Sequence, residues 1–400
     1  MTTERAASSP QVLRRINSEA LLARALTTGA FDASAAMLAT GLTRSTVLAL
    51  CEELVRLGWL VRLDDSRAAG EYSKGRPASR WELQPRAGHV VGVDAGQHTV
   101  SAVVADLRGD FTGGVHLAVA EDAAPDVRRE ITRTAVLRAL DEASVEAGSV
   151  FATVIGVPAP VDGSGRSPSG DDHYWTTMNP GLVDAFDGLG EVVVDNDANL
   201  AAIAEQALGA GRDVDSFAAL LSGERFGAGL VVDRALLRGR HGGAGEMRVL
   251  NLVEGVGSAD GLGALARDLA RTARAEERIA ADSPLAAVPT AELGSDVVFA
   301  AASAGDPTAL AIVRTLGQRL ARVCLVLSSL IDVERVVLSG ALAAAAGPVI
   351  EEARGILRTE FYPPVPELVA SSLGAETVVL GAVQRGVALV RAAPLDFRVS

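Results

Sequence analysis

Carboxylates and glycines follow short apolar runs at several points of this chain, in places where a protein could hold an anionic ligand. The run at residues 90–93 leads into Asp94-Ala95-Gly96. A carboxylate beside glycine in a tight turn can hold a metal–phosphate group, because glycine lets backbone amides approach an anion closely. Most turns of this composition are only turns, so this one is weak evidence by itself.

Three later segments have the same form, an apolar run followed by a polar loop. The runs at residues 154–157, 192–194 and 218–221 lead into loops that contain Asp162, Asp195-Asn196-Asp197 and Ser222-Gly223-Glu224. Strands that alternate with helices and end in polar loops predict an α/β fold. In such a fold, ligands bind at the carboxyl ends of the strands.

The first 85 residues carry a different pattern, that of three short helices. They are expected at residues 17–29, 32–41 and 43–58, the first with Asn17-Ser18 as its cap. In the third, the Thr43 hydroxyl can accept from the free amides of the first turn. The apolar residues of the third helix recur at helical period and predict a buried stripe: Val47, Leu50, Cys51, Leu54 and Leu57.

The second and third helices, joined through Gly41, form a helix-turn-helix pattern that is followed by a hairpin at residues 59–63 and 80–83. In this motif the first residues of the later helix, here the one predicted at residues 43–58, meet base edges. A basic hairpin loop contacts phosphates or the minor groove. We therefore predict contacts with double-stranded DNA from Thr43, Arg44, Ser45, Thr46, Ala49, Lys74 and Arg76. The alternative is a three-helix bundle that binds protein or nothing.

The distribution of charge favours the same interpretation. The chain of 400 residues carries a net charge of −13, yet residues 1–85 hold 11 Lys and Arg against 9 Asp and Glu. A locally basic module on an acidic body is expected of a DNA-binding protein. Two cysteines, Cys51 and Cys324, are too few for a disulfide framework. Residues 1–10 lack the apolar segment of a signal peptide and no apolar run could span a bilayer, so we expect a cytoplasmic protein without membrane contact.

Several motifs, taken in order, resemble the ROK family of repressors and sugar kinases: VGVDAG, GVPAPVDGSG, DNDANLAAIAE, GAGLVVD, GRHGGAGEM and VVLSGALA. The N-terminal segment, which includes Gly75-Arg76-Pro77-Ala78, looks like the head of the xylose-repressor-type regulators. The resemblance implies a winged helix-turn-helix at residues 1–85, followed by an actin-like (ribonuclease H-like) ATPase fold of two α/β lobes around a cleft. The first lobe would span residues 86–196, completed by a C-terminal helix at about 375–400, and the second would span residues 197–374.

The resemblance also implies a sugar pocket. In the family an Asn-Asp pair supplies a sugar contact and the catalytic base, which accepts a proton as the sugar hydroxyl attacks phosphorus, and this pair matches Asn196 and Asp197. Glu246 matches the glutamate of the AGE motif, and Asn179 matches the asparagine of an N-P-G-W-type segment. These four are the predicted ligand contacts. Alternatively they only cap helices and hold loops, since Asn196 and Asp197 precede a predicted helix.

The chain departs from the phosphate loops of the family. His98 stands where a threonine or serine hydroxyl is usual, Glu224 replaces a threonine of the second loop, and Arg225 replaces a glycine there. A carboxylate beside phosphates repels them unless Arg225 compensates its charge. The resemblance therefore implies no ATP binding, no enzymatic activity and no cofactor, with Asp197 as a vestigial base.

The zinc ligands of the family are also missing from the sequence. The histidine position is Val249, and the cysteine positions fall on Glu254, Val256 and Gly261, whereas structural zinc needs four N or S ligands. A second sugar-binding glutamate of the family falls on Gly263. We expect no metal.

The leading hypothesis is a transcriptional regulator, in the first instance a repressor, that binds operator DNA as a homodimer or a dimer of dimers and senses a carbohydrate-like effector. One alternative is an ATP-dependent, glucokinase-like sugar kinase with an added DNA-binding head. Another is a regulator that a partner protein controls without any small ligand. An apolar helix at residues 310–330 could pack at the dimer interface or equally well inside the second lobe. Its apolar residues include Leu316, Leu320, Val323, Leu327 and Leu330.

Overall fold

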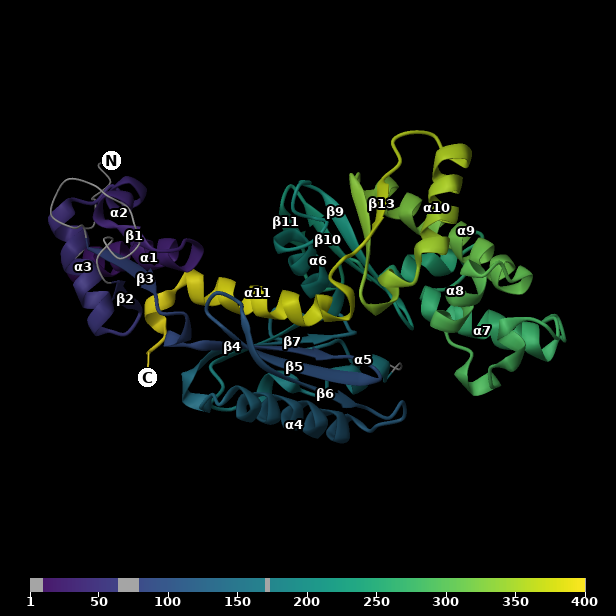
Figure 1. Ribbon diagram of the computed structural model, residues 1–400, viewed down its shortest axis with the longest axis horizontal. Helices are drawn as coiled ribbons and strands as arrows, with labels where there is room; N and C mark the ends of the chain where they lie inside the picture. The colour runs from purple at the N-terminus through teal and green to yellow at the C-terminus, as the bar shows by residue number, and fades with distance from the viewer. Residues whose placement is uncertain (1–9, 64–78, 170–172, 400) are drawn as a thin grey trace.

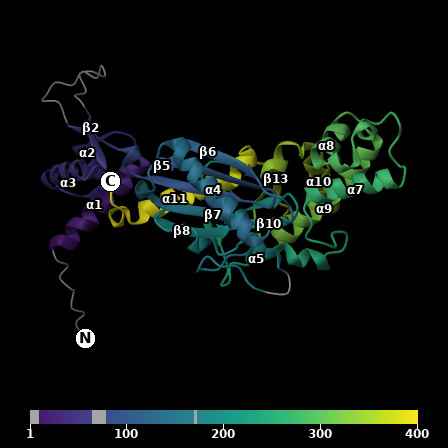
Figure 2. The same cartoon turned by 90° about the horizontal axis from the view of Figure 1, so that it is seen from below.

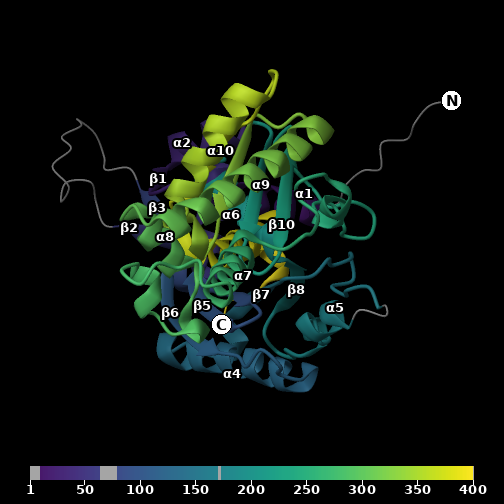
Figure 3. The ribbon, with the colours of Figure 1, turned by 90° about the vertical axis from the view of Figure 1, so that its right-hand side faces the viewer.

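The computed structural model describes residues 10–63, 79–169 and 173–399. The molecule is elongated, with an N-terminal head of residues 10–63 and 79–84 at one end and the helices that lie between residues 262 and 360 at the other (Figures 1 and 2). Two five-stranded sheets lie between these ends. Viewed along the long direction, α4 (Pro125–Ala143) covers one side of the molecule and α10 (Gly347–Glu360) the opposite side (Figure 3).

Three helices form most of the head: α1 (Pro10–Thr27), α2 (Ala33–Thr40) and α3 (Arg44–Arg56). Side chains cap the N-termini of α2 and α3, and the cap of α3 is the predicted Thr43. The Asp32 carboxylate accepts from the backbone N–H of Ala35 at 2.8 Å, and the Thr43 hydroxyl accepts from that of Thr46 at 3.3 Å. Gly41 ends α2 with a φ of +70°, in the left-handed region that favours glycine. The chain bends by 108° between α2 and α3.

Two details of these helices correct the sequence prediction. Helix α1 begins at Pro10 and not at Asn17, and Ser18 lies inside the helix with 5% of its surface exposed. The added turns carry two ion pairs, Arg14 with Glu53 of α3 and Arg15 with Asp396 near the C-terminus. Leu57 was expected in the buried stripe but caps the C-terminus of α3 and is 45% exposed, whereas the other four stripe residues are buried.

A small antiparallel sheet completes the head, in the order β1-β3-β2. Its strands are β1 (Phe31–Asp32), β2 (Leu60–Leu63) and β3 (Arg80–Leu83). The pairing of β2 with β3 confirms the predicted hairpin, with Leu60 opposite Leu83. The short strand β1 was not predicted, because two residues are too few for a visible alternation of apolar and polar residues.

The first five-stranded sheet has the order β6-β5-β4-β7-β8. Strands β4, β7 and β8 run parallel to one another, and β5 pairs antiparallel with both β4 and β6. Helix α4 (Pro125–Ala143) packs on β5 and β6. Three of the strands were expected from the apolar runs at 90–93, 154–157 and 192–194. The strands are β4 (His89–Ala95), β5 (Thr99–Asp106), β6 (Phe111–Ala118), β7 (Val150–Val157) and β8 (Glu191–Asn196).

The second sheet has the order β11-β10-β9-β12-β13 and carries a helical layer on its outer side. Its strands are β9 (Phe217–Ser222), β10 (Phe226–Val232), β11 (Ala235–Leu237), β12 (Arg335–Ser339) and β13 (Glu367–Ala370). The outer helices are α7 (Leu262–Ala275), α8 (Ser295–Ser303), α9 (Pro307–Ile331) and α10 (Gly347–Glu360).

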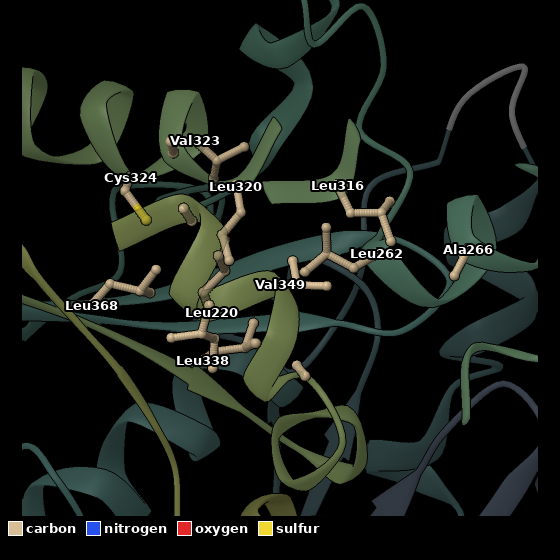
Figure 4. Packing of buried hydrophobic residues seen from close by; sticks show 14 of the residues in the cluster. Leu220, Leu262, Ala266, Leu316, Leu320, Val323, Cys324, Leu338, Val349 and Leu368 are labelled. Carbon is tan, nitrogen blue, oxygen red and sulfur yellow. The ribbon is translucent and has the colours of Figure 1, made fainter. Parts of the chain in front are cut away.

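Helix α9 is the apolar helix for which the sequence left two packing positions open. Its side chains Leu316, Leu320 and Val323 belong to the buried core of this region, with Leu320 toward Leu220 and Leu338 of the sheet (Figure 4). Leu327 is also buried, and Leu330 alone among the five named residues is largely exposed, at 70%. The stripe therefore packs inside the second half of the molecule and offers little apolar surface to another copy.

Two helices lie between the two sheets and cross each other, α6 (Asp197–Ala207) and α11 (Thr377–Ala392). Ala201 and Ala202 of α6 pack on the second sheet, whereas Val383 and Val387 of α11 pack on the first. The backbones meet at Gly381, where an added Cβ would lie 1.9 Å from the Leu200 carbonyl oxygen. Only glycine permits so close a crossing.

The head and the first sheet share one hydrophobic core. The ring of Trp59 in the head lies 5.7 Å from that of Phe151 on β7, which stacks on Phe397 at 5.1 Å between ring centroids. Arg108, between β5 and β6, donates to the Thr28 carbonyl oxygen and to the Glu82 carboxylate of the head. The head is thus packed against the body rather than joined to it by a linker alone.

No helix within the described residues is, taken singly, long and apolar enough to cross a membrane. Helices α2 and α3 together have enough length and apolar character, but the chain bends by 108° between them.

Candidate functional site

A cavity of about 1610 Å³ opens between the two sheets. The carboxyl end of β4 contributes Asp94, and the junction of β8 with α6 contributes Asn196 and Asp197. The β9–β10 loop and the segment after β11 contribute residues 222–226 and 246–248 from the other side. Polar residues at the ends of strands thus meet in one place, as expected for a fold of this class.

Three of the carboxylic acids that line this cavity have raised pKa values. Burial raises the pKa of Asp94 to about 7. The pKa of Asp197 is raised to about 8, first by burial and then by the charges of Asp94 and Glu246. Burial also raises the pKa of Glu246, while Arg225 and Arg248 oppose that shift. Near neutral pH this group therefore holds protons that solvent-exposed carboxylic acids would have lost.

The predicted ligand residue Asn196 is engaged by the protein. Its Oδ1 accepts from the backbone N–H of Asn199 at 3.1 Å, which makes it the N-cap of α6, and its Nδ2 donates to the Ala159 carbonyl oxygen at 3.0 Å. The buried Asp195 supports this arrangement by accepting from Asn199 and from Arg238, the latter at 2.6 Å. Asn196 lines the cavity and caps the helix at the same time.

Asn179 lies apart from the other predicted ligand residues. Its side chain is buried, at 7% exposure, and it is not among the described residues that line the cavity. Its Nδ2 donates to the Gly165 carbonyl oxygen at 3.1 Å and to the Ser167 hydroxyl at 3.0 Å. Its Oδ1 is buried and has no hydrogen-bond partner within the described part of the chain.

The β9–β10 loop, which corresponds to the second phosphate loop, is held by an ion pair that the sequence did not predict. Arg267 of α7 donates two hydrogen bonds to the Glu224 carboxylate, at 2.6 and 2.8 Å, and lowers the pKa of Glu224. Nε2 of His98, from the first sheet, lies 3.8 Å from Glu224 Oε1. The counter-charge of Glu224 is therefore Arg267, and not Arg225 as the sequence suggested.

The same loop occupies the N-terminus of α7, a position at which free backbone amides could otherwise bind an anion. The backbone N–H of Leu262 donates to the Ser222 hydroxyl at 2.9 Å, and that of Ala264 donates to the Gly223 carbonyl oxygen at 3.2 Å. A Cβ at Gly261 or Gly263 would lie 2.4 or 2.9 Å from that carbonyl oxygen. Glycine at these two positions allows the loop to pack against the helix.

The segment at residues 253–260, where the family's cysteines would stand, is held by a buried arginine. Arg319 of α9 donates to the carbonyl oxygens of Val256, Ser258 and Asp260, the last two at 2.6 and 3.1 Å. Over the described ranges, no three or more His, Cys, Asp and Glu side chains are grouped so that they could hold a metal ion. Cys51 and Cys324 are buried and unpaired.

Aromatic and cationic side chains from opposite sides of the cavity lie against each other. The guanidinium of Arg225 lies 5.4 Å from the ring centroid of Tyr174, and that of Arg248 lies 5.7 Å from that of Trp175. Tyr174 and Trp175 belong to α5 (Tyr174–Met178), next to the first sheet. Sequence reasoning missed Tyr174, Trp175 and Arg248, and only the replacement of glycine by Arg225 pointed to this region.

A second candidate site is the N-terminal end of α3, in the head. Thr43, Arg44, Ser45 and Ala49 are exposed there, and Thr46 is half-buried. The Thr43 hydroxyl also lies 3.1 Å from the Ser45 hydroxyl and 2.9 Å from that of Thr46. Lys74 and Arg76, the remaining predicted DNA contacts, lie outside the described residues.

Comparison with known proteins identifies relatives over most of the chain. The model of the ROK family matches residues 90–386. The DNA-binding transcriptional dual regulator NagC of Escherichia coli is 22% identical over 330 residues, which cover 80% of this chain and 79% of NagC. A crystal structure of a ROK family transcriptional regulator, a homologue of the E. coli MLC protein, has a TM-score of 0.72 at 19% identity and covers 97% of this chain and 99% of its own. A ROK family glucokinase from Streptomyces griseus, solved with glucose and AMPPNP, has a TM-score of 0.61 at 25% identity and covers 74% and 99%.

Proposed function

Because this chain belongs to the ROK family, we propose that it is a DNA-binding transcriptional regulator, in the first instance a repressor, with no kinase activity. The observation that carries the proposal is the exposed N-terminal end of α3, which presents Arg44 between hydroxyl side chains. The similarity to NagC over 80% of the chain supports it. Operator DNA would be its macromolecular partner, and the cytoplasm its location.

We propose that the head is a winged helix-turn-helix in which α3 enters the major groove. A bend of 108° between α2 and α3 is within the range of known helix-turn-helix motifs. The β2–β3 hairpin would be the wing, with Lys74 and Arg76 in the connection between its strands. Thr43, Arg44, Ser45, Thr46 and Ala49 would make the contacts at the groove.

We propose the same division of the chain that the sequence predicts. The head would span residues 1–85, the first lobe residues 86–196 with the C-terminal segment 375–400, and the second lobe residues 197–374. The two sheets and the position of α11 on the first of them support this division. A homodimer or dimer of dimers would bind half-sites spaced by whole turns of the DNA, about 34–36 Å per turn.

The cavity between the lobes would be an effector site for a carbohydrate-like ligand rather than a kinase active site. Asp197 and Glu246 line it and would accept from sugar hydroxyls, together with Asn196 at the edge of the site. Asn179 would contribute indirectly through the segment around Gly165. The filled N-terminus of α7, whose backbone amides could otherwise meet phosphates, opposes nucleotide binding.

Binding to DNA can be tested by an electrophoretic shift assay on the DNA upstream of the protein's own gene. Arg44→Ala should weaken the specific complex by about 5- to 150-fold, the effect of about 1–3 kcal/mol expected for a base contact. Arg56→Ala is the matched control, an exposed arginine at the opposite end of the same helix. No specific complex at moderate salt would contradict the proposal.

A sugar kinase is the second candidate, favoured by the position of Asp197 in the cavity and by the likeness to the S. griseus glucokinase. A coupled assay of ADP release over a panel of hexoses should detect no turnover. Turnover that Asp197→Asn abolishes would establish the kinase instead.

A further inference from the structure

Two exposed arginines, Arg225 and Arg248, line the cavity. No hydrogen bond or ion pair to the side chain of Arg225 or Arg248 is found among residues 10–63, 79–169 and 173–399. The Arg225 guanidinium lies over the ring of Tyr174, 5.4 Å from its centroid, and that of Arg248 lies over the ring of Trp175, 5.7 Å from its centroid. A ring below a guanidinium restricts its plane and leaves its N–H groups at the edge free to meet a ligand.

The acids around these arginines leave their charge largely uncompensated. Glu224, the neighbour of Arg225 in sequence, is occupied by Arg267. Asp94 and Asp197 have pKa values of about 7 and 8 and therefore carry less than a full negative charge at neutral pH. Both Arg225 and Arg248 act on Glu246 and oppose the rise of its pKa. The other charged or titratable residues of the lining are His98, His116 and Glu376.

Arg225 lies in the β9–β10 loop, which corresponds to the second phosphate loop of the family. The backbone amides at the start of α7 are turned toward the β9–β10 loop, since Leu262 and Ala264 donate to Ser222 and Gly223. An anion in this part of the cleft would therefore meet guanidinium groups rather than backbone amides. Arginine binds carboxylate and phosphate alike, through two parallel hydrogen bonds in one plane.

We propose that Arg225 and Arg248 form a binding site for the anionic group, carboxylate or phosphate, of an acidic sugar-like effector. This inference rests on the proposed effector role of the cleft and specifies the ligand class. The anionic group would lie between the two guanidiniums beside Tyr174 and Trp175. The hydroxyl groups would face Asp94, Asp197 and Glu246, of which the protonated acids can donate as well as accept.

Isothermal titration calorimetry of the full chain at pH 7 tests the proposal with three probes: glucose, glucuronate and glucose 6-phosphate. At least one anionic sugar should bind 10-fold or more tightly than glucose. Preference for glucuronate would identify the group as a carboxylate, and preference for glucose 6-phosphate would identify it as a phosphate. Equal affinity for all three, or binding of neither anionic sugar, would overturn the proposal.

The arginines are tested by Arg225→Gln and Arg248→Gln, each of which should reduce the advantage of the anionic sugar over glucose about 10-fold. Arg212→Gln is the matched control, an exposed arginine outside the cavity lining, and should keep that advantage. Thermal melts of each variant identify any loss of folding, and the ratio of two ligands on one sample is independent of the folded fraction. If both variants kept the full advantage, Arg225 and Arg248 would not be the anion site. The gel shift of the wild-type protein is a separate readout, so failure here leaves the DNA-binding proposal intact.

Discussion

Asp197 stands at the start of α6 with a pKa of about 8, far from the 3.8 of an ordinary aspartic acid. Because the folded chain holds this proton more tightly than the unfolded chain, Asp197 adds stability that is fully present below pH 4 and lost as the pH rises through 8. At pH 7 the folded protein keeps most of that proton. The acid is therefore suited to hydrogen bonding in a neutral form and, above pH 8, costs stability.

Asp197→Asn should accordingly stabilise the protein at high pH. We expect a gain of several kcal/mol at pH 9, at most about 6 kcal/mol for a shift of about four pKa units at about 1.4 kcal/mol each, and a difference close to zero at pH 4. Urea melts at pH 4, 7 and 9 measure it. The control is Asp162→Asn, because hydrogen bonds from Ser164 and Arg166 lower the pKa of Asp162. That variant should not gain stability between pH 7 and 9, and a pH-independent effect of Asp197→Asn would contradict the prediction.

Sequence reasoning identified the residues of the cavity that lie in strand-to-loop motifs and missed those supplied by packing. Asp94, Asp197 and Glu246 follow local motifs and meet in the cavity. Arg267 and Trp175 lie in segments without a motif and reach the site only because α7 and α5 pack beside it. The arginine that neutralises Glu224 makes a tertiary contact. The sequence therefore suggested the adjacent Arg225, whereas Arg267 donates to Glu224 in the folded chain.

At the scale of elements, strands were easier to predict than helix ends. The apolar runs at 90–93 and 154–157 lie in β4 and β7, as predicted. They were recognisable because strands buried on both faces consist of continuous apolar residues. Strand β6 escaped notice, since its residues are mostly half-buried or exposed and include Gly113-Gly114. The start of α1 was misplaced: the expected Asn17-Ser18 cap lies inside the helix, and the added turns contact Glu53 and Asp396, which are distant in sequence.

The crossing of α6 with α11 makes a sharp prediction about Gly381. Its Cβ would lie 1.9 Å from the Leu200 carbonyl oxygen, so Gly381→Ala must displace one helix and should cost about 1–3 kcal/mol. Gly355→Ala is the matched control within α10, where a Cβ meets nothing within 4 Å. That change should stabilise by about 0.5–1 kcal/mol, the usual advantage of alanine in a helix. Chemical denaturation of both variants measures the contrast, and an equal effect of the two changes would refute this description of the crossing.

At the scale of the whole molecule, the predicted boundary near residue 85 does not separate two cores. Leu21 and Leu54 of the head belong to the same buried cluster as Val90 and Val387 of the body. A sequence pattern can show that a module begins or ends, but it contains no information on whether two modules pack together. We therefore expect the head and the body to unfold in one transition.

Phe397→Ala tests this shared core. Removal of a half-buried ring that stacks on Phe151 should cost about 1–3 kcal/mol and lower the melting temperature of the head and body together. Tryptophan fluorescence, which includes Trp59 at the contact, and circular dichroism should report the same midpoint. Leu252→Ala is the control, because Leu252 is 87% exposed. Two separate transitions in the wild-type protein would show that the head is an independent unit.

Helix α11 reaches both ends of this arrangement, since Val378 and Val379 line the cavity while Val387 and Val390 belong to the cluster shared with the head. Its 16 residues make a rod of about 24 Å at 1.5 Å per residue. Such a rod works as a lever: a ligand that tilted its cavity end by about 5° would shift the far end by about 2 Å. In a two-fold assembly the opposite head would move by an equal amount. The distance between the two copies of α3 would then change by up to about 4 Å, compared with about 34 Å for one turn of DNA.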